Sequence, residues 1–436
     1  MNRSIFIFIL SLFFMLFFVT LSHAKSPPPG TGKADVKANI LIMLDKSGSM
    51  GWAQSTPDLR GPIDVAVNSA GLVHVLDYDD NAIKIFGTDG TLLKTMTGNF
   101  YGPNPVYGRN NQRHYMYYPT KIIVDKYDNY WVLNKGRYEP GEILKFNSSN
   151  KFVCSFSYDV GNITLVDGMA TDSKGRILLA QHHSPFIQVI DNDCDFVGKI
   201  ESPMKPGGTI AINSSDEIFI GKYRYAHDHI RKVTNWDKFS SFPNSGKPKS
   251  EWIVRDSTYV KGPISSGYGC GNNKLMGLLD LNFTADGTLY GLDYYCNKMV
   301  KISGPTGISS WRQDPNGYLG SWSVDASFGS RGAGNNQWDY GYGMGTSGND
   351  LYVADYHNRR VVKYDASTTF ASYDTKIGTS FTSMDMAKRV IKAIMRNSSI
   401  TDGANFGLME WSCNYKIRVN VSDTGAQEIL ADIDNI

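Results

Sequence analysis

Over most of its length the chain alternates short apolar runs with turn-forming Asp, Asn and Gly residues. The clearest example is 63–86, where three runs of about five residues are separated by such turns. Apolar and polar residues alternating at this length predict β-strands with one face buried. Similar segments recur along the chain at 121–146, 168–190, 209–233, 287–302 and 350–364.

This repetition predicts an all-β propeller. A period of roughly 40–50 residues with about four strands in each copy is typical of propeller blades. The six copies therefore predict a six-bladed propeller over 57–375, and the pattern resembles NHL repeats. Asp77, Asp293 and Asp355 occupy the same place in the three best copies. Because a structural role repeats and a catalytic role seldom does, we expect these carboxylates to cap turns.

A different pattern flanks the repeats. The apolar run 40–44 has the length and composition of a strand buried on both faces of a parallel sheet. After the repeats, apolar spacing predicts helices near 384–395 and 424–433, with strands at 404–412 and 415–421 between them. We expect the strand at 38–44 to pair in one sheet with these two later strands.

The run ends in Asp45, Ser47 and Ser49, with Gly48 between the two serines. The carboxyl edge of such a sheet is where open α/β folds place ligands. One carboxylate and two hydroxyls form a hard oxygen set, which predicts a divalent cation such as Mg²⁺, Ca²⁺ or Mn²⁺. The alternative is a Ser/Gly turn that caps a helix.

The segments 38–52 and 380–436 resemble the amino-terminal von Willebrand factor type A domain of PilY-type adhesins at type IV pilus tips. The resemblance implies an α/β Rossmann-like domain with a metal-ion-dependent adhesion site, split into 38–56 and 376–436 by the propeller. It also implies a Thr and an Asp ligand from two later loops, which would follow Ile436. We therefore expect an incomplete domain, as in the front part of a longer protein; the alternative is a decayed or partner-completed domain.

The first residues predict export. A polar start, an apolar run and Ser22-His23-Ala24 are typical of a secretory signal peptide over 1–24, followed by a linker at 25–37. An uncleaved membrane anchor is the alternative, and no second segment has the length of a membrane span. With a net charge of +2 and no basic run with interleaved aromatic residues, the sequence gives no case for nucleic-acid binding.

The 5 cysteines of an exported chain permit disulfides. Cys270–Cys296 is the preferred pair and Cys154–Cys194 the second, while Cys413 is expected to be a core thiol. Three inserts, 99–113, 235–271 and 308–337, are rich in Gly, Tyr, Trp and Asn. Such loops suit either a contact surface or ordinary loop packing.

Taken together, these features predict an exported, non-enzymatic adhesion protein. Its ligand would be a protein or cell-surface molecule, or pilus subunits, in the periplasm, outer membrane or pilus of a Gram-negative bacterium. One alternative is a metal-dependent lyase or hydrolase on the propeller, using His182, His183, His227 or His229. The other is a structural surface protein with an inactive metal site.

Overall fold

The structure is a computed structural model of the 436-residue chain. It describes residues 37–46, 58–104, 109–135, 141–157, 166–181, 184–201, 208–222, 230–242, 247–255, 257–262, 269–272, 274–306, 321–366, 372–378, 383–411 and 415–433. The chain divides into two units. One covers residues 48–386, and the other combines the segments 1–47 and 387–436.

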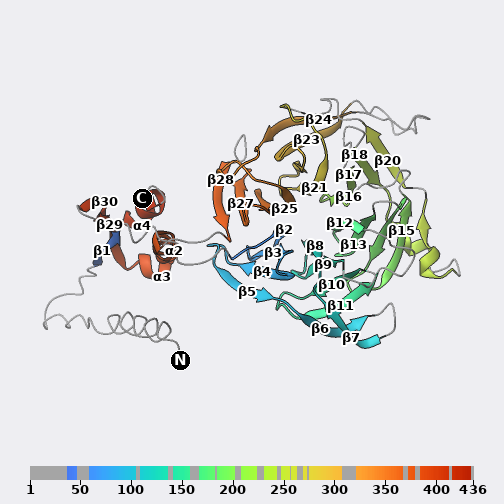
Figure 1. Cartoon of the computed structure of the whole chain (residues 1–436), viewed down its shortest axis with the longest axis horizontal. Helices are drawn as coiled ribbons and strands as arrows, with labels where there is room; N and C mark the ends of the chain where they lie inside the picture. The colour runs from blue at the N-terminus through green and yellow to red at the C-terminus, as the bar shows by residue number, and fades with distance from the viewer. Residues whose placement is uncertain are drawn as a thin grey trace. The chain divides into compact units, whose positions relative to one another are not determined.

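The larger unit is a ring of six antiparallel sheets, here called blades 1 to 6. Figure 1 shows the sheets arranged around a centre, with the first strand of each blade innermost. The predicted propeller is therefore confirmed. Blade 1 contains β2 (Pro62–Val67), β3 (Val73–Asp77), β4 (Ala82–Phe86) and β5 (Leu92–Met96). Blade 2 contains β8 (Pro119–Val124), β9 (Tyr130–Asn134), β10 (Glu142–Phe146) and β11 (Phe152–Ser157).

The next two blades carry small additions. Blade 3 contains β12 (Val166–Thr171), β13 (Ile177–Gln181), β14 (Phe186–Ile190) and β15 (Phe196–Glu201). The short β19 (Ile253–Val254) extends blade 3 by pairing in parallel with β15. Blade 4 contains β16 (Gly208–Ile212), β17 (Ile218–Lys222), β18 (Ile230–Thr234) and β20 (Thr258–Gly262). The 3-10 helices η4 (Phe239–Ser241) and η6 (Lys249–Glu251) lie between β18 and β19.

The last two blades complete the ring. Blade 5 contains β21 (Leu278–Phe283), β22 (Leu289–Asp293), β23 (Lys298–Thr306) and β24 (Ser321–Phe328). Blade 6 contains β25 (Gly341–Ser347), β26 (Asp350–Asp355), β27 (Arg360–Asp365) and β28 (Ser372–Ile377). The inner strand β25 contacts β2, so the last blade lies against the first. A hairpin of β6 (Asn99–Asn104) and β7 (Arg109–Tyr115) forms from the insert 99–113.

Apolar clusters fill the junctions between neighbouring blades. At the junction of blades 2 and 3, for example, Trp131, Phe156 and Leu179 are fully buried in one cluster. The corresponding clusters join every other adjacent pair, including blades 6 and 1. The alternating strands therefore bury their side chains between blades. The central channel is left to the residues of the six inner strands.

Both predicted disulfides are present. Cys154 in β11 is bonded to Cys194 in the β14–β15 turn, with their Cα atoms 6.2 Å apart. Cys270 is bonded to Cys296, with their Cα atoms 5.2 Å apart. The first bond links blades 2 and 3, and the second links the connection before β21 to the β22–β23 turn of blade 5. Cys413 lies outside the described residues.

We expect the Cys154→Ala/Cys194→Ala variant to lose roughly 2–4 kcal/mol of unfolding free energy, the range typical of a native disulfide. The bond closes a loop between residues 40 apart in sequence, so its loss enlarges the unfolded ensemble. Urea unfolding of oxidised protein measures the change. Reducing agent should lower the stability of the wild type below that of the double variant, because it also breaks the Cys270–Cys296 bond. An unchanged midpoint in the double variant would contradict the expectation.

The smaller unit contains β1 (Ala38–Asp45), β29 (Ala404–Trp411), β30 (Tyr415–Ser422), α3 (Ser398–Thr401) and α4 (Gly425–Asp432). The helix α2 (Ser383–Met395) belongs to this unit from residue 387 onwards. β1 pairs in parallel with β29, and β29 pairs antiparallel with β30. The expected pairing of 38–44 with the two later strands is confirmed. α4 packs against β29 and β30.

Two expectations for this unit are wrong. β1 is not buried on both faces, because only Leu44 is buried and Met43 is 70% exposed. The predicted Rossmann-like type A domain is not found either. Such a domain needs a mostly parallel sheet with helices on both faces. The described sheet has one parallel and one antiparallel pair, and its Met43 face is open to solvent.

Candidate functional site: a charged layer across the propeller channel

A charged layer crosses the central channel. Five inner strands have an irregularity in the same register, each skipping one residue against its neighbouring strand. In each of these strands, the first residue that pairs after the skipped one lies at the same height in the channel. In β16, which has no bulge, the second residue lies at this height. The layer formed in this way contains Asp64, Lys121, Gly168, Thr209, Asp280 and Gly343.

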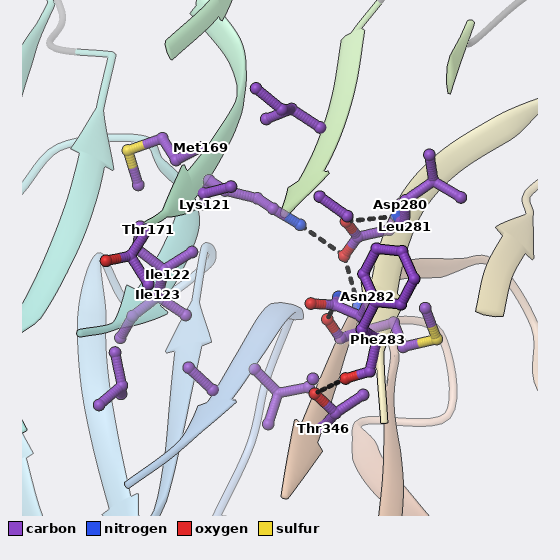
Figure 2. Close-up of a pocket in the computed structure, with 18 of the residues that line it drawn as sticks. Lys121, Ile122, Ile123, Met169, Thr171, Asp280, Leu281, Asn282, Phe283 and Thr346 are labelled. Atoms are coloured by element: carbon purple, nitrogen blue, oxygen red, sulfur yellow. Dashed lines mark hydrogen bonds and ion pairs between the residues drawn. The ribbon is translucent and has the colours of Figure 1, made fainter. Parts of the chain in front are cut away.

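Three charged side chains of the layer form one cluster. The Lys121 ammonium on blade 2 lies 3.4 Å from Asp64 Oδ1 on blade 1, and it also donates to Asp280 Oδ2 on blade 5. Figure 2 shows Lys121 reaching towards Asp280. Blades 2 and 5 are opposite one another in a ring of six, so this ion pair spans the channel. Thr209 Oγ1 on blade 4 lies 3.5 Å from Asp280 Oδ1.

Both carboxylates are also bonded to the backbone of the neighbouring blade. Asp64 Oδ2 accepts the Ile122 N–H at 2.7 Å, and Asp280 Oδ2 accepts the Met344 N–H at 2.8 Å. Both carboxylate side chains are only 1% exposed. These bonds fix the two acids at the junctions of blades 1 with 2 and 5 with 6. Lys121 is the cation that they share.

The charges in the cluster do not balance. Burial raises the pKa of Asp64 to about 7, although Lys121 lowers it, and the neighbouring Asp280 raises it further. Burial also acts to lower the pKa of Lys121, but the two carboxylates outweigh it and the pKa is raised. Two acids and one ammonium leave one excess negative charge in a buried place, which favours retaining a proton. The cluster therefore exchanges a proton near neutral pH while Lys121 stays charged.

A cavity of about 210 Å³ lies against this layer and extends towards the turns that follow the inner strands. Lys121 and Asp280 line its charged end. The remaining lining comes from the inner strands of all six blades and is mainly aliphatic, with a few polar side chains such as Asn282 and Thr346. These two are held by bonds to the Met344 and Phe283 carbonyls, at 2.6 and 3.0 Å. Although most lining residues are aliphatic, the surface exposed to the cavity is more polar than apolar, so the cavity suits a small polar compound.

The predicted site residues lie elsewhere. Asp45 ends β1 in the smaller unit and is half-buried, while Ser47 and Ser49 lie outside the described residues. His182, His183, His227 and His229 also lie outside them. Within the described ranges, no group of three or more His, Cys, Asp or Glu side chains is placed to hold a metal ion. The divalent-cation site stays a prediction.

The recurring aspartates are structural, as predicted. Asp77 accepts the N–H groups of Arg60 and Gly61 and is 2.9 Å from the Lys84 ammonium. Asp293 accepts from Met276 and Gly277 in the same manner. Asp355 accepts the Asp339 N–H and pairs with Arg360. Each carboxylate holds the loop that leads into its own blade's inner strand.

The channel cluster was not predicted from the sequence, although the sequence contains a signal for it. Asp64, Lys121 and Asp280 each adjoin apolar residues near the start of an inner strand. An isolated charge in a buried strand requires a partner. The partner of Lys121 is 159 residues away, so only the closed ring identifies it.

No family model matches the chain, and no curated protein is detectably similar to it. Solved structures are similar to it at low identity. Virginiamycin B lyase from Staphylococcus aureus is 13% identical, with a TM-score of 0.42, covering 75% of this chain and 87% of that one. A streptogramin B lyase structure is 12% identical, with a TM-score of 0.42 and coverages of 85% and 96%. The PQQ-bound aldose sugar dehydrogenase from Streptomyces coelicolor is 7% identical, with a TM-score of 0.40 and coverages of 71% and 92%.

These comparisons correct two expectations. The resemblance to the type A domain of PilY-type adhesins is wrong, because no family model matches the chain and the described small sheet, with one parallel and one antiparallel pair, lacks the architecture of that domain. The expectation of a non-enzymatic chain took the propeller for a binding scaffold. The lyase and the dehydrogenase named above have a propeller fold too, so the fold gives no ground for that expectation and it is withdrawn. Separately, no helix in the described ranges is both long and apolar enough to span a membrane.

Proposed function

We propose that the chain is an exported propeller enzyme whose central channel carries out acid–base chemistry on a small carbonyl or carboxyl compound. The observation that supports this proposal is the buried Lys121 ammonium shared by Asp64 and Asp280 at the end of a cavity. Strongly shifted ionisable groups beside a cavity are typical of active sites. The reaction class is that of a lyase or a hydrolase.

The roles follow from the charges. Lys121 stays protonated and faces the cavity, so it would stabilise negative charge that develops on a substrate oxygen. Asp280 also lines the cavity and would accept a proton from the substrate or from water. Asp64 lies beside Lys121 and, with a pKa of about 7, keeps the cluster able to gain or lose a proton near neutral pH. Asp64 acts here as a positioning residue.

Export is the second part of the proposal. Two disulfides in the propeller support an oxidising compartment. The signal peptide predicted over 1–24 lies outside the described residues. The cation set Asp45, Ser47 and Ser49 is a separate prediction, to be tested by metal analysis of the full chain and its Asp45→Ala variant.

A substrate screen tests the catalytic proposal. The full-length protein is incubated in D₂O with lactones, esters and β-substituted carboxylic acids, and products are followed by NMR. We expect turnover of at least one class, and a loss of roughly 10²-fold or more in Lys121→Met and Asp280→Asn, the size typical of a lost acid–base group. The matched control is Lys126→Met, because Lys126 lies in an exposed turn, where its ammonium donates to the Ser173 carbonyl and lies 4.9 Å from the Tyr127 ring centroid.

The pH dependence gives a second readout. The rate of the wild type should change through about pH 7, where the cluster exchanges its proton. Asp64→Asn should shift or remove this step while keeping a bond acceptor for Ile122. Turnover that survives in Lys121→Met, or no turnover in any substrate class, would contradict the proposal. The cluster would then act only in holding the blades together.

A further inference from the structure

Tyrosines gather at the end of the propeller opposite the cavity. In the three best repeats the capping aspartate is followed directly by Tyr78, Tyr294 or Tyr356. These residues follow β3, β22 and β26, at the same end of the ring where the inner strands begin. The cavity lies beyond the charged layer, towards the other ends of the inner strands. The tyrosines are therefore separate from the proposed catalytic site.

Two further tyrosines stand just before inner strands in a strained backbone conformation. Tyr118 precedes β8 and Tyr340 precedes β25, with φ angles of +51° and +59°. Their N–H groups donate to Asn81 and Asn297 of the preceding blades, at 2.7 and 2.9 Å. The same arrangement thus occurs at the junction of blades 1 and 2 and at the junction of blades 5 and 6.

The rings at each junction form a pair. Tyr78 and Tyr118 are stacked with ring centroids 5.2 Å apart, and Tyr294 and Tyr340 are 5.4 Å apart. Tyr342 and Tyr356 connect the two pairs, since Tyr342 lies 5.3 Å from both Tyr294 and Tyr356. The Tyr356 hydroxyl donates to Asp79 beside Tyr78 at 3.0 Å. We call this set the tyrosine surface: Tyr78, Tyr118, Tyr294, Tyr340, Tyr342 and Tyr356.

The strain indicates that the two tyrosines are retained for their rings. A positive φ is a genuine outlier for a bulky residue, whereas Gly and Asn adopt it readily. The bonds that fix the loops use the backbone N–H groups of Tyr118 and Tyr340, which any residue other than proline would supply. Strained residues kept by their surroundings cluster at functional sites. Tyr118 remains 37% exposed, so its ring is available to a ligand.

We infer that the tyrosine surface binds a neutral polysaccharide built from repeating sugar units. A sugar ring presents an apolar C–H face that packs on an aromatic ring, and a rim of hydroxyls that pair with phenol and carboxylate oxygens. The surface offers both, with Asp79 exposed beside the rings. The two tyrosine pairs lie at equivalent blade junctions, so they suit a polymer whose sugar units repeat.

The charges around the surface favour a neutral ligand. Arg60 pairs with Asp80 at 3.1 Å, and Arg331 pairs with Asp339 at 2.7 Å. His357 also lies 3.2 Å from Asp339. These acids and bases already satisfy one another, and the exposed Asp79 carboxylate, which accepts the Tyr356 hydroxyl, is placed to accept sugar hydroxyls. The surface therefore has no dominant charge with which to select an ionic polymer.

Affinity electrophoresis of the full chain through gels containing soluble neutral polysaccharides tests the inference, with calorimetry on cellohexaose and chitohexaose. The test variants are Tyr118→Asn and Tyr340→Asn, because asparagine accepts the positive φ and keeps the backbone N–H. The matched control is Tyr127→Asn, an exposed tyrosine in the β8–β9 turn at the other end of the ring. We expect retardation of the wild type, and about tenfold weaker binding in each test variant.

Thermal melts accompany the binding assay. Because asparagine relieves the strain, the two test variants should melt within a few degrees of the wild type or above it. Weakened binding in a stable variant supports the inference. Absence of binding across the neutral panel, binding unchanged in both variants, or a protein partner that competes for the same tyrosines would overturn it. Activity in the channel should be unchanged in these variants, so this inference can fail independently of the proposed enzyme.

Discussion

Replacing Gly343 with alanine is expected to lower the unfolding free energy of the propeller by more than about 3 kcal/mol, at the upper end of overpacking effects. A Cβ at this position would lie 2.0 Å from Asp64 Oδ1 and 2.7 Å from both the Asp64 Cα and the Ile63 carbonyl oxygen. Two of these three contacts involve backbone atoms. The clash can therefore be relieved only by moving the strands apart.

The clash falls at the contact between blades 1 and 6, where the ring closes; we call this contact the seam. Apart from β19, which extends blade 3 from the connection between β18 and β20, the strands of each blade follow one another along the chain, and none of the described strands is exchanged between the first and last blades. Closure rests on packing of β25 against β2, with a 3.3 Å bond from the Leu59 N–H to the Gly378 carbonyl. An alanine at Gly343 would push directly on this contact and on the charged layer beside it.

Urea unfolding followed by circular dichroism measures the effect. Gly271→Ala is the matched control, because a Cβ there meets only the flexible Lys274 side chain, at 3.5 Å or more. We expect the control to stay within about 0.5 kcal/mol of the wild type, as is usual for surface substitutions. A Gly343→Ala variant as stable as the control would mean that the blades separate easily at the seam.

The blades could be predicted because their inner three strands are short, largely apolar runs bounded by turn residues, but two outer strands were not predicted. β20 and β24 fall inside the segments 235–271 and 308–337, which were interpreted as inserts. The signal for β24 was present, because polar and apolar residues alternate strictly over Ser321–Phe328. It is easily overlooked because the segment around it is rich in Gly, Asn and Ser.

Burial and the channel cluster could not be predicted from local sequence. The run in β1 identified a strand and its partners correctly, yet composition does not show whether a second layer covers it. Asp64 and Asp280 resemble other aspartates near strands, and only ring closure brings Lys121 between them. The disulfides were easier, because Cys270 and Cys296 are only 26 residues apart and near turns.

The second large effect is expected for Lys121→Met, which should destabilise the protein by roughly 3–5 kcal/mol near pH 8, the cost of breaking a buried ion pair. Methionine fills a similar volume, so packing changes little. The loss is electrostatic, because Asp64 and Asp280 are left without the cation that Lys121 provides. Lys126→Met, in an exposed turn, is the control and should change stability by less than about 0.5 kcal/mol.

The effect should depend on pH in a definite direction. Burial raises the pKa of Asp64 to about 7 in the folded protein, above the 3.8 of an unperturbed carboxyl, so the folded state binds its proton more tightly than the unfolded state does. The stability that this proton supplies is complete below about pH 4 and is lost as the pH rises through 7. Without Lys121, which lowers the pKa of Asp64, that pKa should rise further.

Unfolding curves of the wild type and Lys121→Met near pH 5 and pH 8 separate electrostatics from packing. At pH 5 a proton on the carboxyl pair partly replaces the missing ammonium, so the difference between the two proteins should shrink to about half or less. Adding Asp280→Asn to Lys121→Met should recover stability near pH 8, because one of the two unpaired acids is then neutral. If Lys121→Met loses the same unfolding free energy at both pH values, and Asp280→Asn does not restore it, Lys121 acts through packing alone. The proposed acid–base role would then lose its electrostatic basis, because that role requires a proton in this layer to be exchangeable near neutral pH.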